Sequence, residues 1–139
     1  MNSPKPPENL NARVTYERLG FPDKVIDSYT MKDMSRSTVD VAIDHFLAIM
    51  QNWIQDKPHY SIWDMRPAKS VVLMTPYMKS RVIEGYSLGK CPLYVAVITN
   101  IAFLDTDSKA FLNNQNLDVT NTTRFYTAFE TGLDWLKEA

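Results

Sequence analysis

The pattern of apolar and polar positions over residues 14–31 predicts two short strands joined by a turn. Residues 14–19 and 24–31 are rich in β-branched and aromatic side chains, which strands favour. Residues 20–23, reading Gly-Phe-Pro-Asp, form a turn-forming cluster between them. A β-hairpin is therefore expected. In the second arm polar and apolar residues alternate irregularly, which is typical of a strand at the edge of a sheet.

The next segment predicts a long amphipathic helix. Residues 37–40, reading Ser-Thr-Val-Asp, resemble an N-cap followed by an acidic residue, so the helix is expected to start there. Pro58 has no amide hydrogen and ends it. The apolar residues recur at helical spacing and predict one buried face, made of Val39, Ala42, Ile43, Phe46, Leu47, Met50, Trp53 and Ile54.

Strands and helices then alternate to the end of the chain. Residues 60–65 predict a strand, and Thr75 with Pro76 predicts the N-cap and first position of a helix. Residues 93–99 are apolar at nearly every position, which is expected of a strand covered on both faces, and we place it at the centre of the sheet.

The last third of the chain is patterned more weakly. A helix is expected at residues 107–113 and a short strand at 123–126. Residues 127–130, reading Thr-Ala-Phe-Glu, resemble a capping box that opens a final helix.

The elements together predict an α/β fold. Their order is strand, strand, helix, strand, helix, strand, helix, strand, helix. The hairpin gives an antiparallel pair, and each strand-helix-strand unit favours parallel pairing. We expect a mixed sheet of about five strands with helices packed on it. Residues 1–12, rich in proline and asparagine, are interpreted as a mobile tail, and residues 13–139 as one domain.

Composition narrows the choice of partners. The 15 basic and 16 acidic side chains leave a net charge of -1, so neither nucleic acid nor an anionic membrane is favoured. No apolar run is long enough to span a membrane. The single cysteine, Cys91, excludes an intrachain disulfide and indicates the cytoplasm; its thiol is expected to be buried. We predict no cofactor.

Several stretches resemble the SpoIIAA-like proteins of the STAS-domain type. The resemblance rests on residues 60–66 (Tyr-Ser-Ile-Trp-Asp-Met-Arg) followed by Thr-Pro-Tyr at 75–77, on residues 93–98 and 124–126, and on the Gly-Leu-Asp-Trp-Leu of residues 132–136. Gly132 stands where such a helix often has alanine, for close packing. The resemblance covers most of residues 14–138.

This resemblance implies a non-enzymatic module that contacts proteins or holds a small apolar ligand. It also implies that a serine near the start of the helix after the strand can be phosphorylated. Ser70 and Thr75 lie in that region, but residues 66–77 contain no Asp-Ser pair of the kind that marks the phosphorylated position, so we do not predict a phosphorylation switch.

Few residues are suited to chemistry. His45 is interpreted as a boundary residue and His59 as a solvent-exposed strand end. Asp64 and Arg66 lie on one side of a strand end and could orient a polar ligand against the helix that Thr75 opens, although a structural ion pair is the stronger interpretation. The candidate ligand- or partner-binding set is Asp64, Arg66, Ser70, Thr75, Tyr77 and Arg81.

Two functions remain open. The first is a regulatory module that contacts another protein, of which a homodimer is one form. The second is a carrier or sensor of a small apolar ligand held between helices and sheet, which the seven methionines and sixteen aromatic residues would suit. Ordinary core packing by these residues is the stronger interpretation, and an enzyme is the least favoured class.

Overall fold

A computed structural model describes residues 8–54, 57–69, 75–88, 91–100 and 121–139. Within them lie six strands and three α-helices with a short 3-10 turn. The strands are β1 (Glu8–Asn11), β2 (Val14–Gly20), β3 (Val25–Met31), β4 (His59–Asp64), β5 (Leu93–Ile98) and β6 (Asn121–Tyr126). The helices are α1 (Arg36–Gln51), η1 (Arg66–Ala68), α2 (Pro76–Leu88) and α4 (Phe129–Glu138).

The six strands form one mixed sheet in the order β1-β2-β3-β4-β5-β6. β1, β2 and β3 pair antiparallel, and β3 to β6 pair parallel. The predicted hairpin and the predicted parallel pairing after it are both confirmed. Each of the described strands lies beside its neighbour in chain order.

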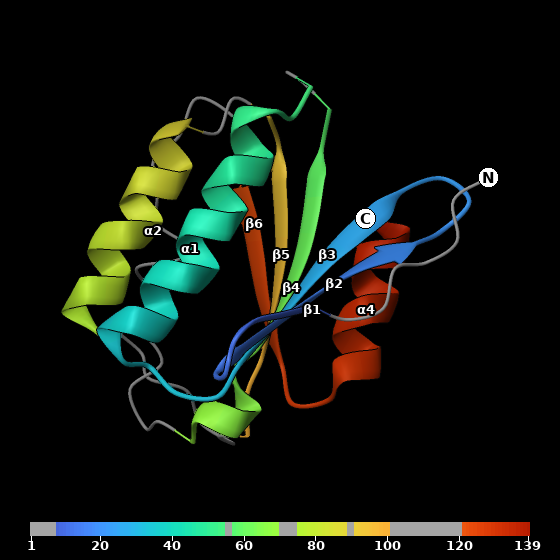
Figure 1. Ribbon diagram of the computed structural model, residues 1–139. Helices are drawn as coiled ribbons and strands as arrows, with labels where there is room; N and C mark the ends of the chain where they lie inside the picture. The colour runs from blue at the N-terminus through green and yellow to red at the C-terminus, as the bar shows by residue number, and fades with distance from the viewer. Residues whose placement is uncertain (1–7, 55–56, 70–74, 89–90, 101–120) are drawn as a thin grey trace.

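Helices cover both faces of the sheet (Figure 1). α1 and α2 lie side by side on one face, and α4 lies on the other. The larger apolar core fills the space beneath α1 and α2 and includes Tyr29, Phe46 and Trp63. The smaller core lies under α4 and is centred on Ile62, Ile98 and Leu136. Because strand side chains alternate between faces, the central strands contribute to both cores.

Local sequence explains where the helices begin. Ser35 is the N-cap of α1, and its Oγ accepts a hydrogen bond from the Thr38 amide at 3.4 Å. The N-cap of α1 therefore lies two residues before the predicted cap, Ser37. Thr75 caps α2 as predicted, since its Oγ1 accepts from the Met78 amide at 3.2 Å. The capping box predicted at residues 127–130 is wrong: α4 begins after Ala128, which makes no side-chain cap.

The structure shows an additional strand inside the segment that was predicted to be a mobile tail. Glu8–Asn11, inside the predicted tail of residues 1–12, pairs with β2, and Leu10 packs against the larger core. Backbone pairing and this apolar contact order a segment whose composition suggested mobility. The sheet thus has six strands rather than about five.

Two strands lie elsewhere in the sheet than predicted. β3 is between β2 and β4 instead of at an edge, because its polar Asp27 is neutralised by neighbours on the same face. β5 is covered on both faces as expected, but β3 and β4, not β5, are the middle pair. The helix predicted at residues 107–113 lies outside the described residues.

Candidate functional site

A fully buried carboxylate, Asp27, lies in the middle of the sheet on the face covered by α1. Its side chain is 0% exposed. The hairpin register places Arg18 directly opposite Asp27, and strand alternation brings Tyr16 to the same face. His59 reaches it from the neighbouring strand β4. A charge at this depth requires several hydrogen bonds to remain stable.

Four donors satisfy the two oxygens of Asp27. Its Oδ1 accepts from the Tyr16 hydroxyl at 2.6 Å and from Arg18 Nε at 2.7 Å. Its Oδ2 is 3.1 Å from Arg18 Nη2 and 2.8 Å from His59 Nε2. The side chain of Arg18 is 40% exposed, so this residue carries the network from the interior to the surface.

The network fixes the protonation states of its members. Burial alone would raise the pKa of Asp27, but hydrogen bonds from His59, Arg18 and Tyr16 outweigh burial and hold this pKa well below its usual range. Burial, followed by the hydrogen bond to Asp27, raises the pKa of Tyr16 well above its usual value. Asp27 is thus an anion and Tyr16 a neutral donor at neutral pH.

His59 is buried, contrary to the exposed strand end predicted from the sequence. It is 1% exposed because its ring fits between Phe46 and Trp53, with centroid distances of 5.4 and 4.7 Å. Its Nδ1 has no hydrogen-bond partner among the described residues. The Asp27 carboxylate can only accept, so Nε2 of His59 carries the proton of this hydrogen bond.

A second imidazole lies next to this network. His45 on α1 is half-buried, as predicted, and its Nδ1 is 2.8 Å from the Tyr29 hydroxyl. Its ring also packs on Tyr16, with centroids 4.2 Å apart. Tyr29 in turn stacks on Trp63 at 4.2 Å. These aromatic contacts hold the interior rigid beneath the helix.

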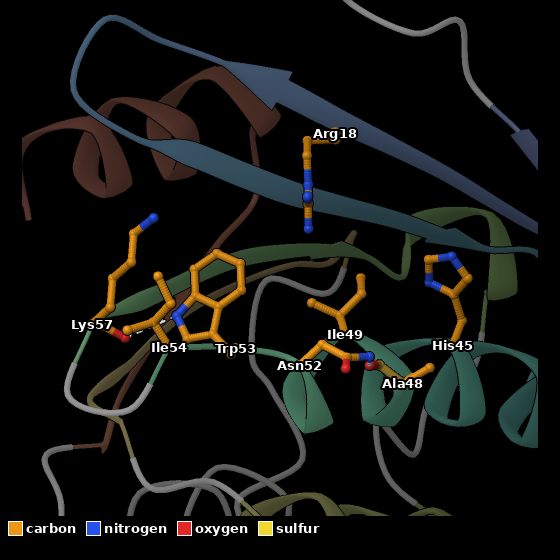
Figure 2. Close-up of a pocket in the computed structure, with 8 residues that line it drawn as sticks. All are labelled: Arg18, His45, Ala48, Ile49, Asn52, Trp53, Ile54 and Lys57. Carbon is orange, nitrogen blue, oxygen red and sulfur yellow. Dashed lines mark hydrogen bonds between the residues drawn. The ribbon is translucent and has the colours of Figure 1, made fainter.

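A solvent-open cavity of about 460 Å³ lies between the end of α1 and the sheet, and none of its described lining residues is buried. Figure 2 shows the Arg18 side chain extending from the strand above towards the helix, with His45 on one side and Trp53 and Lys57 on the other. The lining residues are Arg18, His45, Ala48, Ile49, Asn52, Trp53, Ile54 and Lys57. This volume is within the range of small-molecule sites.

The cavity walls are apolar with basic groups at the rim. Ile54 was predicted to lie on the buried face of α1, but it follows the end of the helix and is 68% exposed. The Trp53 indole is held in place, because its Nε1 donates to the Lys57 carbonyl at 2.8 Å. The Lys57 ammonium lies 5.1 Å from the Trp53 ring centroid. None of the described lining residues is acidic.

The predicted pair Asp64 and Arg66 forms a two-pronged ion pair at the end of β4. Arg66 Nε and Nη2 donate to the two carboxylate oxygens of Asp64 at 2.9 and 2.8 Å, and the Arg66 amide donates to Oδ1 at 3.1 Å. The Arg66 carbonyl accepts from Asn100 at 2.8 Å. These bonds fix the turn that follows the strand.

Two other predicted residues join α2 to α1. The Tyr77 hydroxyl donates to Asp40, and Arg81 bonds both Asp40, at 3.0 Å, and Asp44. Thr75 is occupied as the α2 cap, and Ser70 lies outside the described residues. In the part of the chain described, Asp64 and Arg66 bond locally whereas Tyr77 and Arg81 bond α1. The predicted set is therefore not brought together into one site.

Sequence reasoning missed Asp27, Arg18 and Trp53 as site residues. One signal was present: counting back from the turn at residues 20–23 places Arg18 opposite Asp27 in the predicted hairpin. His59 joins them from 32 residues away in the chain, and no local pattern records that contact.

Across the described ranges, no group of three or more His, Cys, Asp or Glu side chains could hold a metal ion. No helix in these ranges is long and apolar enough to cross a membrane. A scan against protein-family models gave no match, and searches of curated proteins and of solved structures gave none either.

Proposed function

We propose that this domain is a non-enzymatic binding module for a small molecule, which it holds between α1 and the sheet. The observation that carries the proposal is the cavity of about 460 Å³ next to the buried Asp27 network. Of the two functions that the sequence left open, the ligand carrier or sensor is the one that this cavity favours.

The burial of the ionisable groups supports binding rather than catalysis. A general acid or base must lie within hydrogen-bond reach of its substrate. Asp27 and His59 are 0% and 1% exposed and bond each other, so burial separates both side chains from a molecule bound at the open cavity. Their role in this proposal is to hold Arg18 in a fixed position at the cavity.

Contact with another protein is the second candidate. It is favoured by Ile54, whose exposed side chain beside Trp53 could insert into a partner. The SpoIIAA-like, STAS-type assignment and a cytoplasmic location also remain proposals. The mixed sheet with helices on both faces is compatible with this assignment, but it supports only the α/β class.

Native mass spectrometry of freshly purified protein tests the ligand proposal. We expect extra mass of a few hundred daltons that is lost on denaturation. Ala48→Trp fills the cavity wall and should abolish this extra mass, whereas Thr131→Trp, an exposed site on α4 at the opposite face, should keep it. A bare wild-type chain, as monomer or dimer, would contradict the proposal and favour protein contact.

A further inference from the structure

We infer that the ligand of this cavity is a flat apolar molecule, such as an aromatic ring system, that carries one anionic group. This inference rests on the proposed small-molecule function and names the chemical class of the ligand. It follows from the position of two cations, Arg18 and Lys57, at a cavity whose apolar lining is Ala48, Ile49, Trp53 and Ile54 and whose other polar lining residues, His45 and Asn52, are not acidic.

The apolar part of the ligand is matched by the floor and wall of the cavity. Ala48, Ile49 and Ile54 offer aliphatic surface, and the immobilised Trp53 offers an aromatic one. The exposed Ile54 gains most from being covered, because removing apolar surface from water is favourable in proportion to the area buried. A ring system of two or three fused rings is of suitable size for this volume.

Arg18 is a pre-organised donor for the anionic group. A guanidinium has five N–H donors, and the bonds to Asp27 use the Nε donor and one on Nη2. Three N–H donors remain, and the Arg18 side chain is 40% exposed and lines the cavity. Because Asp27 fixes the guanidinium plane, little conformational entropy is lost when an anion binds.

Two sources of negative potential oppose an anion here, and both are reduced. The charge of Asp27 lies behind Arg18 and is surrounded by its four donors. The helix end of α1 also carries partial negative charge. However, the Ala48 carbonyl accepts from the Asn52 side chain at 3.1 Å, and the Ile49 and Met50 carbonyls accept from the Asn52 backbone amide.

Among the described lining residues, Lys57 is the cation that has no acidic partner. Arg18 and Asp27 neutralise each other, whereas the ammonium of Lys57 contacts only the neutral ring of Trp53 among the interactions described at the cavity. An anion is attracted by this ammonium and a cation is repelled. Charge selectivity should therefore depend on Lys57, and Arg18 should supply directional hydrogen bonds.

Three naphthalene derivatives of similar shape test the inference. They are 2-naphthoate, which is anionic, 2-naphthalenemethanol, which is neutral, and 2-naphthylmethylammonium, which is cationic. Affinities are measured by calorimetry at low salt. We expect 2-naphthoate to bind about tenfold more tightly than the alcohol, since a charge-assisted bond contributes roughly 1.4 kcal/mol or more. We expect the ammonium to bind most weakly.

Substitutions at and away from the cavity test whether Lys57 causes the preference for 2-naphthoate. Lys57→Met should reduce the preference of 2-naphthoate over the alcohol about threefold, and Lys57→Glu should abolish it. Lys57 is exposed, so folding is unaffected. Lys32→Met removes the same charge from an exposed position just after the far end of β3 and should change nothing. Ala48→Trp should abolish binding of 2-naphthoate.

The outcomes separate the two proposals. Equal affinity for all three compounds, or a preference for the ammonium, overturns the anion inference and leaves the small-molecule function standing. Failure of all three compounds to bind at millimolar concentration overturns both. Binding of 2-naphthoate that survives Ala48→Trp places the compound elsewhere on the protein and also overturns the inference.

Discussion

Replacing Asp27 by asparagine tests whether the buried network stabilises the sheet. The two side chains have nearly the same shape, so the change alters charge and hydrogen bonding without leaving a cavity. One carboxylate oxygen becomes an NH₂ group, which donates and cannot accept. Either Tyr16 and Arg18 Nε or His59 and Arg18 Nη2 then face a donor instead of an acceptor.

The expected loss is about 2–4 kcal/mol in the free energy of unfolding. Removing one partner of a buried ion pair costs roughly 3–5 kcal/mol. Arg18 is 40% exposed and regains water when its partner is lost, which lowers that figure. The total stability of a domain is only about 5–15 kcal/mol. The variant should therefore fold at 25 °C but melt roughly 10 °C below the wild type.

The difference should depend on pH in a defined direction. The folded pKa of Asp27 is lowered relative to an unfolded value of about 3.9. Its contribution is therefore complete above pH about 5 and is lost as the pH falls towards the folded pKa, because the unfolded chain takes up the proton first. The asparagine side chain of the variant does not titrate, so the gap between the two proteins should narrow below pH about 4.

Urea unfolding followed by tryptophan fluorescence measures both effects. Curves are collected between pH 7 and pH 3 for the wild type, Asp27→Asn and Asp23→Asn. Asp23 is exposed in the hairpin turn, and its change should stay within about 0.5 kcal/mol. A loss below about 1 kcal/mol for Asp27→Asn, or a gap that stays constant down to pH 3, would refute the reasoning.

Two further predictions concern α4. A Cβ on Gly132 would lie 2.7 Å from Ile98 Cδ1 and 3.3 Å from both Ala96 and Tyr126, so Gly132→Ala should destabilise the protein by about 1 kcal/mol in the wild type. The same change should be neutral or stabilising in an Ile98→Val background, because Cδ1 is gone and helix propensity favours alanine. Urea unfolding of the wild type, the two single variants and the double variant measures both effects. An equal loss of stability in the two backgrounds would exclude the clash. Lys24 Nζ donates to the Leu136 and Ala139 carbonyls at 3.0 and 2.9 Å and lies 4.1 Å from the Tyr60 ring centroid. Lys24→Met should therefore increase amide hydrogen exchange in α4 and leave exchange in α1 unchanged. An equal increase in both helices would contradict this prediction.

Much of the architecture could be predicted because it depends on local pattern. The hairpin, the apolar face of α1 and the Thr75 cap are each determined by residues close in sequence. The family resemblance implied a small residue for close packing at Gly132, and a Cβ at this position would lie only 2.7 Å from Ile98 Cδ1. The parallel pairing followed from alternation of strands and helices.

The site could not be predicted because its contacts are long-range. His59 after a proline looked exposed, and only Asp27, on another strand, makes its burial favourable. The irregular alternation of polar and apolar residues made β3 look like an edge strand, whereas its Asp27 is buried against donors from β2 and β4. The cavity arises where α1 ends at Gln51 and the chain continues past Trp53, a position that helical periodicity placed on the buried face.

The strictly sequential order of the sheet has a consequence for how the chain is built on the ribosome. Each described strand pairs with the one that precedes it, so the sheet can grow at a single edge as the chain emerges, without opening pairs already made. The hairpin that holds Arg18 and Asp27 is complete before β4 delivers His59 to it. Among the described elements α4 follows all the strands, and its Leu136 carbonyl accepts from Lys24 at the tip of that hairpin. This hydrogen bond joins residues that are 112 positions apart in the chain.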